Sequence, residues 1–140
     1  MSGRQRFIQY HLPAILWACL IFGLSSIPGK SMPRIDILDW DKGAHIGVNF
    51  IFAFLVYRSF SNKRRTPAQE RALMLFVVLL VSVFGATDEY HQLFVPGRDC
   101  DFFDWLSDTL GAGLFAFVYW RYEKWKAGKP AVVAERNPET

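Results

Sequence analysis

Four uncharged runs limit what this chain can fold into more than any other feature. They cover residues 12–29, 43–57, 72–87 and 109–120. The first has 18 residues, close to the lower limit for a bilayer-spanning helix, and the others have 15, 16 and 12. Because a span needs about 20 residues, each shorter run must take in polar neighbours to cross. A soluble all-α protein is the alternative, but soluble helices normally carry a polar stripe and residues 72–87 have none.

The chain has 140 residues, which suits one domain. The sequence therefore predicts an all-α integral membrane bundle of four transmembrane helices. Residues 12–120 are expected to form the membrane domain, and residues 1–11 a cytoplasmic N-terminus. Residues 121–140 are expected to form a cytoplasmic, disordered tail, because the end of the chain is rich in charge and contains proline.

The positions of Lys and Arg predict the orientation. Of the 16 basic residues, 12 fall at the N-terminus, in residues 58–71 and in the tail from residue 121. Residues 88–108 instead carry six acids and one Arg. The positive-inside rule therefore predicts a multi-pass protein of the cell membrane, with both termini cytoplasmic and the acidic connections outside. A secretory signal is the alternative for the first run, but no clear A-x-A cleavage site follows it.

Polar residues of three helices fall at matching distances from the basic residue that ends each helix on the inside. Three acids on different helices lie 17 residues from that basic residue, and His45 and Asp108 lie 13 residues from it. At about 1.5 Å per residue, these distances define two layers roughly 25 and 20 Å above the basic residues. The three acids are Asp41, Asp88 and Asp104, and the basic residues are Arg58, Arg71 and Arg121.

The same polar residues share helix faces, since residues four apart lie on one side of a helix. Carboxylates within a membrane segment are costly unless they face a bundle interior, a partner or water. The spacing therefore predicts a polar cavity that faces outward. The residues that follow one another at a spacing of four are Asp41, His45 and Asn49, then Asp88 and Gln92, and Asp104 and Asp108.

Residues 95–98, Val-Pro-Gly-Arg, are typical of a turn, because Pro fixes φ and Gly tolerates φ > 0. The turn is expected to bring Arg98 over the cavity, where Lys42 is the other nearby cation. Two roles are open for Arg98. It neutralises the acids, or it presents its planar fork to a ligand phosphate or carboxylate.

The acids and histidines allow two kinds of chemistry. They include enough carboxylate and imidazole for a divalent metal, although no HExxH motif is present. Acid–base catalysis by His45 or by a carboxylate is the other option. Covalent catalysis is not expected, because there is no GxSxG motif and Cys100 has no obvious activating base. The residues concerned are His45, Asp88, Glu89, His91, Asp104 and Asp108.

Other features carry less functional information. No CxxC spacing exists, which excludes zinc-thiolate and thioredoxin-type sites, and Cys19 and Cys100 are not expected to pair. The basic residues are spread over three segments, so nucleic acid is not an expected partner. Small residues four apart, Gly43 with Gly47 and Ser107 with Gly111, are expected to let helices pack closely.

These motifs resemble the VanZ-like family of small bacterial membrane proteins. The match rests on DKGAH at residues 41–45, DEYHQLFVPGR at residues 88–98 and DWLSDTLGA at residues 104–112. Many members have Asn at the position of Asp108, so this chain has an additional carboxylate there. The founding member is associated with teicoplanin resistance, which implies a setting in the cell envelope. The family's residues map to Asp41, Lys42, His45, Asp88, Glu89, Gln92, Phe94, Pro96, Arg98, Asp104, Asp108 and Gly111.

The sequence thus predicts a protein that acts at the outer face of the membrane on an envelope lipid or a lipid-linked cell-wall precursor. A non-enzymatic protein that sequesters a lipid or an amphipathic antibiotic is the alternative, and a divalent metal and the oligomeric state stay open. A transporter is disfavoured because one copy of four short helices offers no inverted repeat. Catalytic roles are assigned to His45, Asp88, Glu89 and Asp104, and ligand binding to Asp41, Lys42, Gln92, Arg98 and Asp108.

Overall fold

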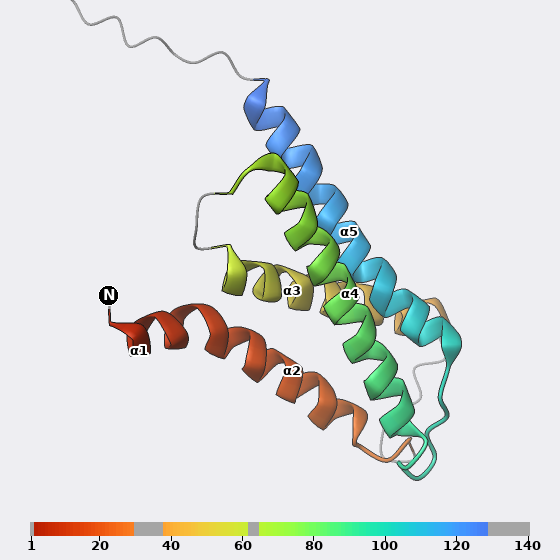
Figure 1. The fold of residues 1–140 in the computed structure, drawn as a ribbon. Helices are drawn as coiled ribbons and strands as arrows, with labels where there is room; N and C mark the ends of the chain where they lie inside the picture. Colours follow the sequence, from red (N-terminus) through yellow and green to blue (C-terminus); the bar gives the residue numbers. More distant parts are fainter. Residues whose placement is uncertain (1, 30–37, 62–64, 129–140) are drawn as a thin grey trace, which may run out of the picture.

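The fold is a bundle of helices, seen in a computed structural model that describes residues 2–29, 38–61 and 65–128 (Figure 1). For residues 38–41 only the backbone is described. No strand occurs in these ranges, which confirms the all-α prediction. The elements are α1 (Gly3–Arg6), the π-helical turn η1 (Phe7–His11), α2 (Leu12–Ser25), α3 (Leu38–Phe60), α4 (Pro67–Gln92) and α5 (Phe102–Ala127).

The helices are longer than the apolar runs from which they were predicted. α3, α4 and α5 have 23, 26 and 26 residues, so each takes in polar neighbours as expected. Three stretches within the described residues are long and apolar enough to cross a membrane: Gly3–Ser25, Lys42–Phe60 and Pro67–Gln92. α5 is as long as α4 but is not among them, since its uncharged run has only 12 residues. The prediction of four spans is thus supported for three helices.

The first helix starts nine residues before the predicted position. Ser2 and Gln5 form a capping box that begins α1 at Gly3, and η1 joins α1 to α2 without a break. The π-helical turn ends at His11, two residues before Pro13, which has no N–H to donate and disturbs the regular ladder. α5 likewise continues to Ala127, inside the segment predicted as a tail, and residues 129–140 lie outside the described part.

α3, α4 and α5 pack around a small apolar core. α4 and α5 run side by side, and α3 crosses them (Figure 1). A Cβ on Gly111 would meet the backbone of Ile46, so α5 touches α3 closely at this point. Gly43 and Gly47 face open space, and the helix contact predicted for them is therefore wrong. The core residues are Phe52, Ala53, Val56, Val77, Val81, Ala112 and Phe115.

The outer faces of the bundle are apolar. Leu75 and Val83 of α4 are 61% and 64% exposed, and many other large apolar side chains are also exposed. In water such surfaces would be unfavourable, whereas lipid tails are as apolar as the side chains. This distribution fits a protein surrounded by lipid.

The polar residues instead gather at the two ends of the bundle. The ends of α2 and α4 and the starts of α3 and α5 meet at one end (Figure 1). The turn predicted there is confirmed, because Gly97 has a φ of 76° and the Arg98 N–H bonds Val95 O at 3.1 Å. At the other end, the side-chain oxygens of Tyr57, Glu70 and Tyr119 lie 2.7–3.0 Å apart and join three helices.

Candidate functional site

Lys42, in the second turn of α3, connects that helix to the start of α5. Its Nζ donates to Asp101 Oδ2 at 2.8 Å and also pairs with Asp104. Asp101 caps α5 through a bond from the Phe103 N–H at 2.8 Å. The bond from Lys42 and the bond from Phe103 lower the pKa of Asp101. The start of α5 is thereby held against α3.

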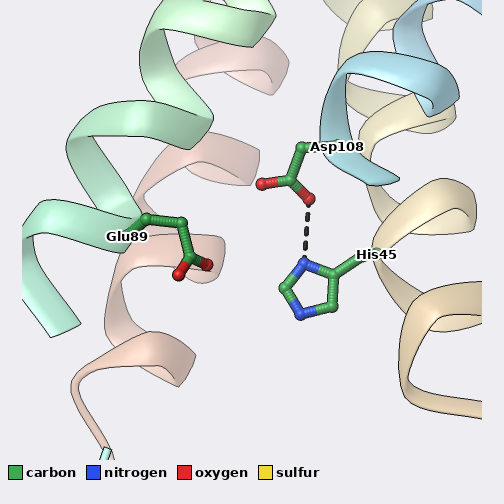
Figure 2. A group of neighbouring side chains, drawn as sticks. All are labelled: His45, Glu89 and Asp108. Carbon is green, nitrogen blue, oxygen red and sulfur yellow. Dashed lines mark hydrogen bonds and ion pairs between the residues drawn. The ribbon is translucent and has the colours of Figure 1, made fainter. Parts of the chain in front are cut away.

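One turn further along α3, His45 meets Asp108 of α5. His45 Nδ1 lies 2.9 Å from Asp108 Oδ1 (Figure 2). His45 Nε2 lies 3.9 Å from an oxygen of Asp104. Asn49, one further turn along, donates from Nδ2 to the same Asp108 oxygen at 2.5 Å. Asp108 is only 4% exposed, so these two donors stand in for water. The position of the Asp108 side chain also requires Gly85, because a Cβ there would lie 2.8 Å from Asp108 Oδ2.

Glu89 of α4 completes a group that we call the His–Glu–Asp cluster, made of His45, Glu89 and Asp108. Each residue offers a ligand atom, and the three atoms lie within 4.8 Å of one another. Figure 2 shows the carboxylate of Glu89 turned toward the imidazole of His45. Glu89 is 3% exposed, and its oxygens accept from the Asp101 N–H at 2.9 Å and from Gln92 Nε2 at 3.3 Å. Two buried carboxylates and one imidazole, each from a different helix, thus lie close together.

Asp88 belongs to a different contact, although it precedes Glu89 in the sequence. Its Oδ1 accepts a hydrogen bond from Ser25 Oγ at 2.6 Å, which ties α4 to the end of α2. Gln92 Nε2 lies 3.4 Å from its other oxygen. The neighbouring His91 stacks on Phe22 with a ring separation of 4.2 Å. Asp88 and His91 therefore connect α4 to α2.

A cavity of about 330 Å³ lies between α2 and this end of the bundle. One wall is apolar and comes largely from α2, and the opposite wall is polar. Arg98 also lines the cavity, and its Nε donates to Ile27 O at 3.3 Å. The lining is mixed, so a polar cavity that faces outward stays a prediction. The apolar lining residues are Trp17, Leu20, Ile21, Leu24, Ala44 and Val48, and the polar ones are Ser25, His45, Asn49, Asp88, Gln92, Arg98 and Asp108.

Most of the residues assigned from the sequence lie together at this end. His45 and Asp108, predicted at the same depth, are in direct contact, and Glu89, Asp104 and Lys42 surround them. Asp41 lies in α3, but its side chain is outside the described residues.

Three further residues of this end were not assigned a role from the sequence. Asn49 follows His45 at i+4, and this spacing placed it on the same inward face, one turn further along, without a role. Asp101 is a helix cap, and an acid just before a helix is a recognisable signal for one. Ser25 ends an apolar run and carries no such signal.

The arrangement allows acid–base chemistry and cation binding. Asp108 orients the His45 ring through Nδ1, as a carboxylate does for an imidazole that moves protons. The His–Glu–Asp cluster also has the ligand types of a divalent metal site. His45 and Asp108 line the polar side of the cavity.

Together, the three long apolar helices, the exposed apolar faces and the polar end define a helical membrane protein. A model of the VanZ/LLP1 family matches residues 10–123, and the chain belongs to this family. The resemblance stated from the three sequence motifs is thereby confirmed. Comparison with curated proteins and with solved structures gave no match.

Proposed function

We propose that this protein acts at the outer face of the membrane on the headgroup of an envelope lipid or a lipid-linked cell-wall precursor. One observation carries the proposal. The cavity of about 330 Å³ joins an apolar wall from α2 to a polar wall that holds His45, Asp108 and Arg98. A lipid has the same two parts, an acyl chain and a polar head, so both parts find matching surroundings.

The proposed orientation places this end outside and the basic segments in the cytoplasm, with α5 as the fourth span. Cys100 lies at the polar end and is exposed, whereas Ser61 follows α3 at the other end. A membrane-impermeant maleimide added to intact cells should label Cys100. It should not label a Ser61→Cys variant in which Cys100 is replaced by Ser. The reverse labelling would contradict the orientation.

Arg98 and Lys42 are the cations proposed to hold an anionic head. Arg98 lines the cavity, and its planar fork suits two oxygens of one phosphate. Lys42 pairs with Asp104 and borders the same polar end. His45, oriented by Asp108, is proposed to move the proton in the reaction. Glu89 is a second buried acid near His45, and Asp88, which bonds Ser25, lines the cavity.

Turnover by the purified protein tests the proposal. The full chain in nanodiscs is incubated with anionic phospholipids and with a polyprenyl-diphosphate-linked cell-wall precursor, and the products are analysed by mass spectrometry. We expect a new lipid product that disappears in His45→Ala and persists in His11→Ala, a histidine at the opposite end. Absence of both binding and turnover with every lipid would contradict the proposal.

Binding without turnover would favour the second candidate, a protein that sequesters a lipid or an amphipathic antibiotic. The apolar wall of the cavity supports this candidate, because it suits a ligand tail whether or not chemistry follows. The family resemblance adds a cellular readout, teicoplanin sensitivity. Expression of the wild-type chain in a sensitive bacterium is expected to raise the inhibitory concentration of teicoplanin, and expression of His45→Ala is not.

A further inference from the structure

We infer that His45, Glu89 and Asp108 form a binding site for a divalent transition-metal ion of the Zn²⁺ class. The three residues come from α3, α4 and α5, and their ligand atoms lie within 4.8 Å of one another (Figure 2). In a tetrahedral zinc site with bonds of about 2.0–2.1 Å, ligand atoms lie roughly 3.4 Å apart. The side chains therefore need to close by about 1.4 Å at most, which small rotamer changes supply.

The ligand types select the metal. One imidazole and two carboxylates suit Zn²⁺ and similar ions, whereas Mg²⁺ and Ca²⁺ prefer oxygen ligands alone. Three protein ligands also leave one position for water or for an oxygen of a bound ligand, as in catalytic zinc sites.

The surroundings of His45 match those of a metal-binding imidazole. Nδ1 faces Asp108, and Nε2 lies 3.9 Å from Asp104 Oδ2. A metal-ligating histidine usually donates its other N–H to a carboxylate, which fixes the ring. Asp104 is positioned to accept the N–H of His45 Nε2, which leaves Nδ1 of His45 to bind the metal. In the metal form the ion replaces the hydrogen between Nδ1 and Asp108, so binding releases a proton.

A second observation comes from Asn49, which is 3% exposed and lines the same cavity as His45 and Asp108. Its Oδ1 is the one buried side-chain polar atom without a hydrogen-bond partner among the described residues. An unsatisfied buried oxygen costs about 1–3 kcal/mol and calls for an explanation. A water bound at the fourth position of the metal would donate a hydrogen bond to this oxygen.

The charges at the site give the inference its functional meaning, which rests on the function proposed above. Glu89 and Asp108 are both buried, and Asp88 lines the same cavity as Asp108. An anionic headgroup would be repelled by these carboxylates. A divalent cation held by two of them cancels their two negative charges and offers a direct bond to a phosphate oxygen.

Metal binding by the wild-type protein is the first test and needs no lipid. The full chain in detergent is stripped with a chelator, loaded with Zn²⁺, desalted and analysed by elemental mass spectrometry. We expect a single Zn²⁺ per chain, together with proton release on loading. A wild-type chain that retains no stoichiometric Zn²⁺ overturns the inference. If such a chain still converts a lipid, the proposed function stands without the metal, and the two ideas fail separately.

Variants then locate the ion. Glu89→Gln and Asp108→Asn keep the shape of the side chain, and each should weaken Zn²⁺ binding more than about 100-fold. Asp104→Asn should weaken it about 10–100-fold, as is typical for a residue that orients a metal ligand. Glu123→Gln, on the exposed end of α5, is the matched control and should bind like the wild type. If Glu89→Gln and Asp108→Asn bind Zn²⁺ like the wild type, the ion binds elsewhere and the inference is wrong.

A histidine-to-cysteine exchange gives a spectroscopic test that does not depend on loss of binding. Cysteine remains a metal ligand, so His45→Cys should still take up Co²⁺ and should gain a thiolate-to-cobalt charge-transfer band. The wild type should show the d–d spectrum of four-coordinate cobalt without that band. If Co²⁺ bound to His45→Cys lacks the band, residue 45 is not a ligand and the inference is wrong.

Discussion

Asp108 offers the sharpest test of how the polar end is built, because one of its oxygens accepts both hydrogen bonds. Oδ1 receives His45 Nδ1 at 2.9 Å and Asn49 Nδ2 at 2.5 Å. In Asp108→Asn, the amide oxygen can take the place of Oδ1 and keep both bonds. The variant also removes a buried charge, which offsets the loss of charge-assisted bonding. We expect its free energy of unfolding to stay within about 1 kcal/mol of the wild type.

Asp108→Ala should behave differently, since His45 Nδ1 and one N–H of Asn49 Nδ2 lose their partner, while Nδ2 keeps its bond to His45 O at 3.1 Å. An unpaired buried donor costs about 1–3 kcal/mol, so two cost about 2–6 kcal/mol. The side chain of His45 is 23% exposed, and water can therefore satisfy part of its loss. The expected destabilisation is about 2–4 kcal/mol, plus a contribution from the cavity that is left.

Unfolding of both variants in mixed micelles, followed by circular dichroism, measures the difference. We expect the alanine variant to unfold at clearly lower denaturant and the asparagine variant to unfold near the wild type. Equal stability of the two variants would mean that the hydrogen bonds to Oδ1 contribute little, and would refute this account of the site.

Three further substitutions test the packing of the bundle. Gly111→Ala should cost about 1–3 kcal/mol because the new Cβ meets the backbone of α3, whereas Gly43→Ala faces open space and should be neutral or stabilise by up to about 1 kcal/mol. Tyr57→Phe should cost about 1–2 kcal/mol, since its hydroxyl bonds Glu70 at 2.7 Å at the opposite end of the bundle. Thermal unfolding in detergent checks all three variants, and an unchanged melting temperature for Gly111→Ala or Tyr57→Phe would contradict the packing described.

Much of the fold was predictable because helix length and polarity are local properties. The apolar runs located the helices, and the Pro-Gly pair located the turn that ends with Arg98. The length of the first helix was underestimated, because the capping box at Ser2 lies outside the apolar run. Gly43 and Gly47 were expected at a helix contact, but spacing does not tell which side of α3 meets α5, and they lie on an open side.

The sequence predicted those contacts of the site that depend on how far along its helix each residue lies. His45 and Asp108 were placed in one layer by counting from basic residues, and they are in hydrogen-bond contact. Depth does not reveal rotation about the helix axis, so the sequence did not separate Glu89, which joins His45, from Asp88, which bonds Ser25 of α2. Adjacent residues of a helix point about 100° apart and meet different neighbours.

Binding of an anionic lipid through Arg98 tests the central claim most directly. Arg98→Lys keeps the positive charge at this position but loses the planar fork of the guanidinium. The variant should therefore unfold within about 1.5 kcal/mol of the wild type. Native mass spectrometry of the purified proteins should find an anionic lipid on the wild type and little or none on Arg98→Lys. A variant that retains the lipid in full, or a wild type that carries none under any lipid supply, would contradict the account.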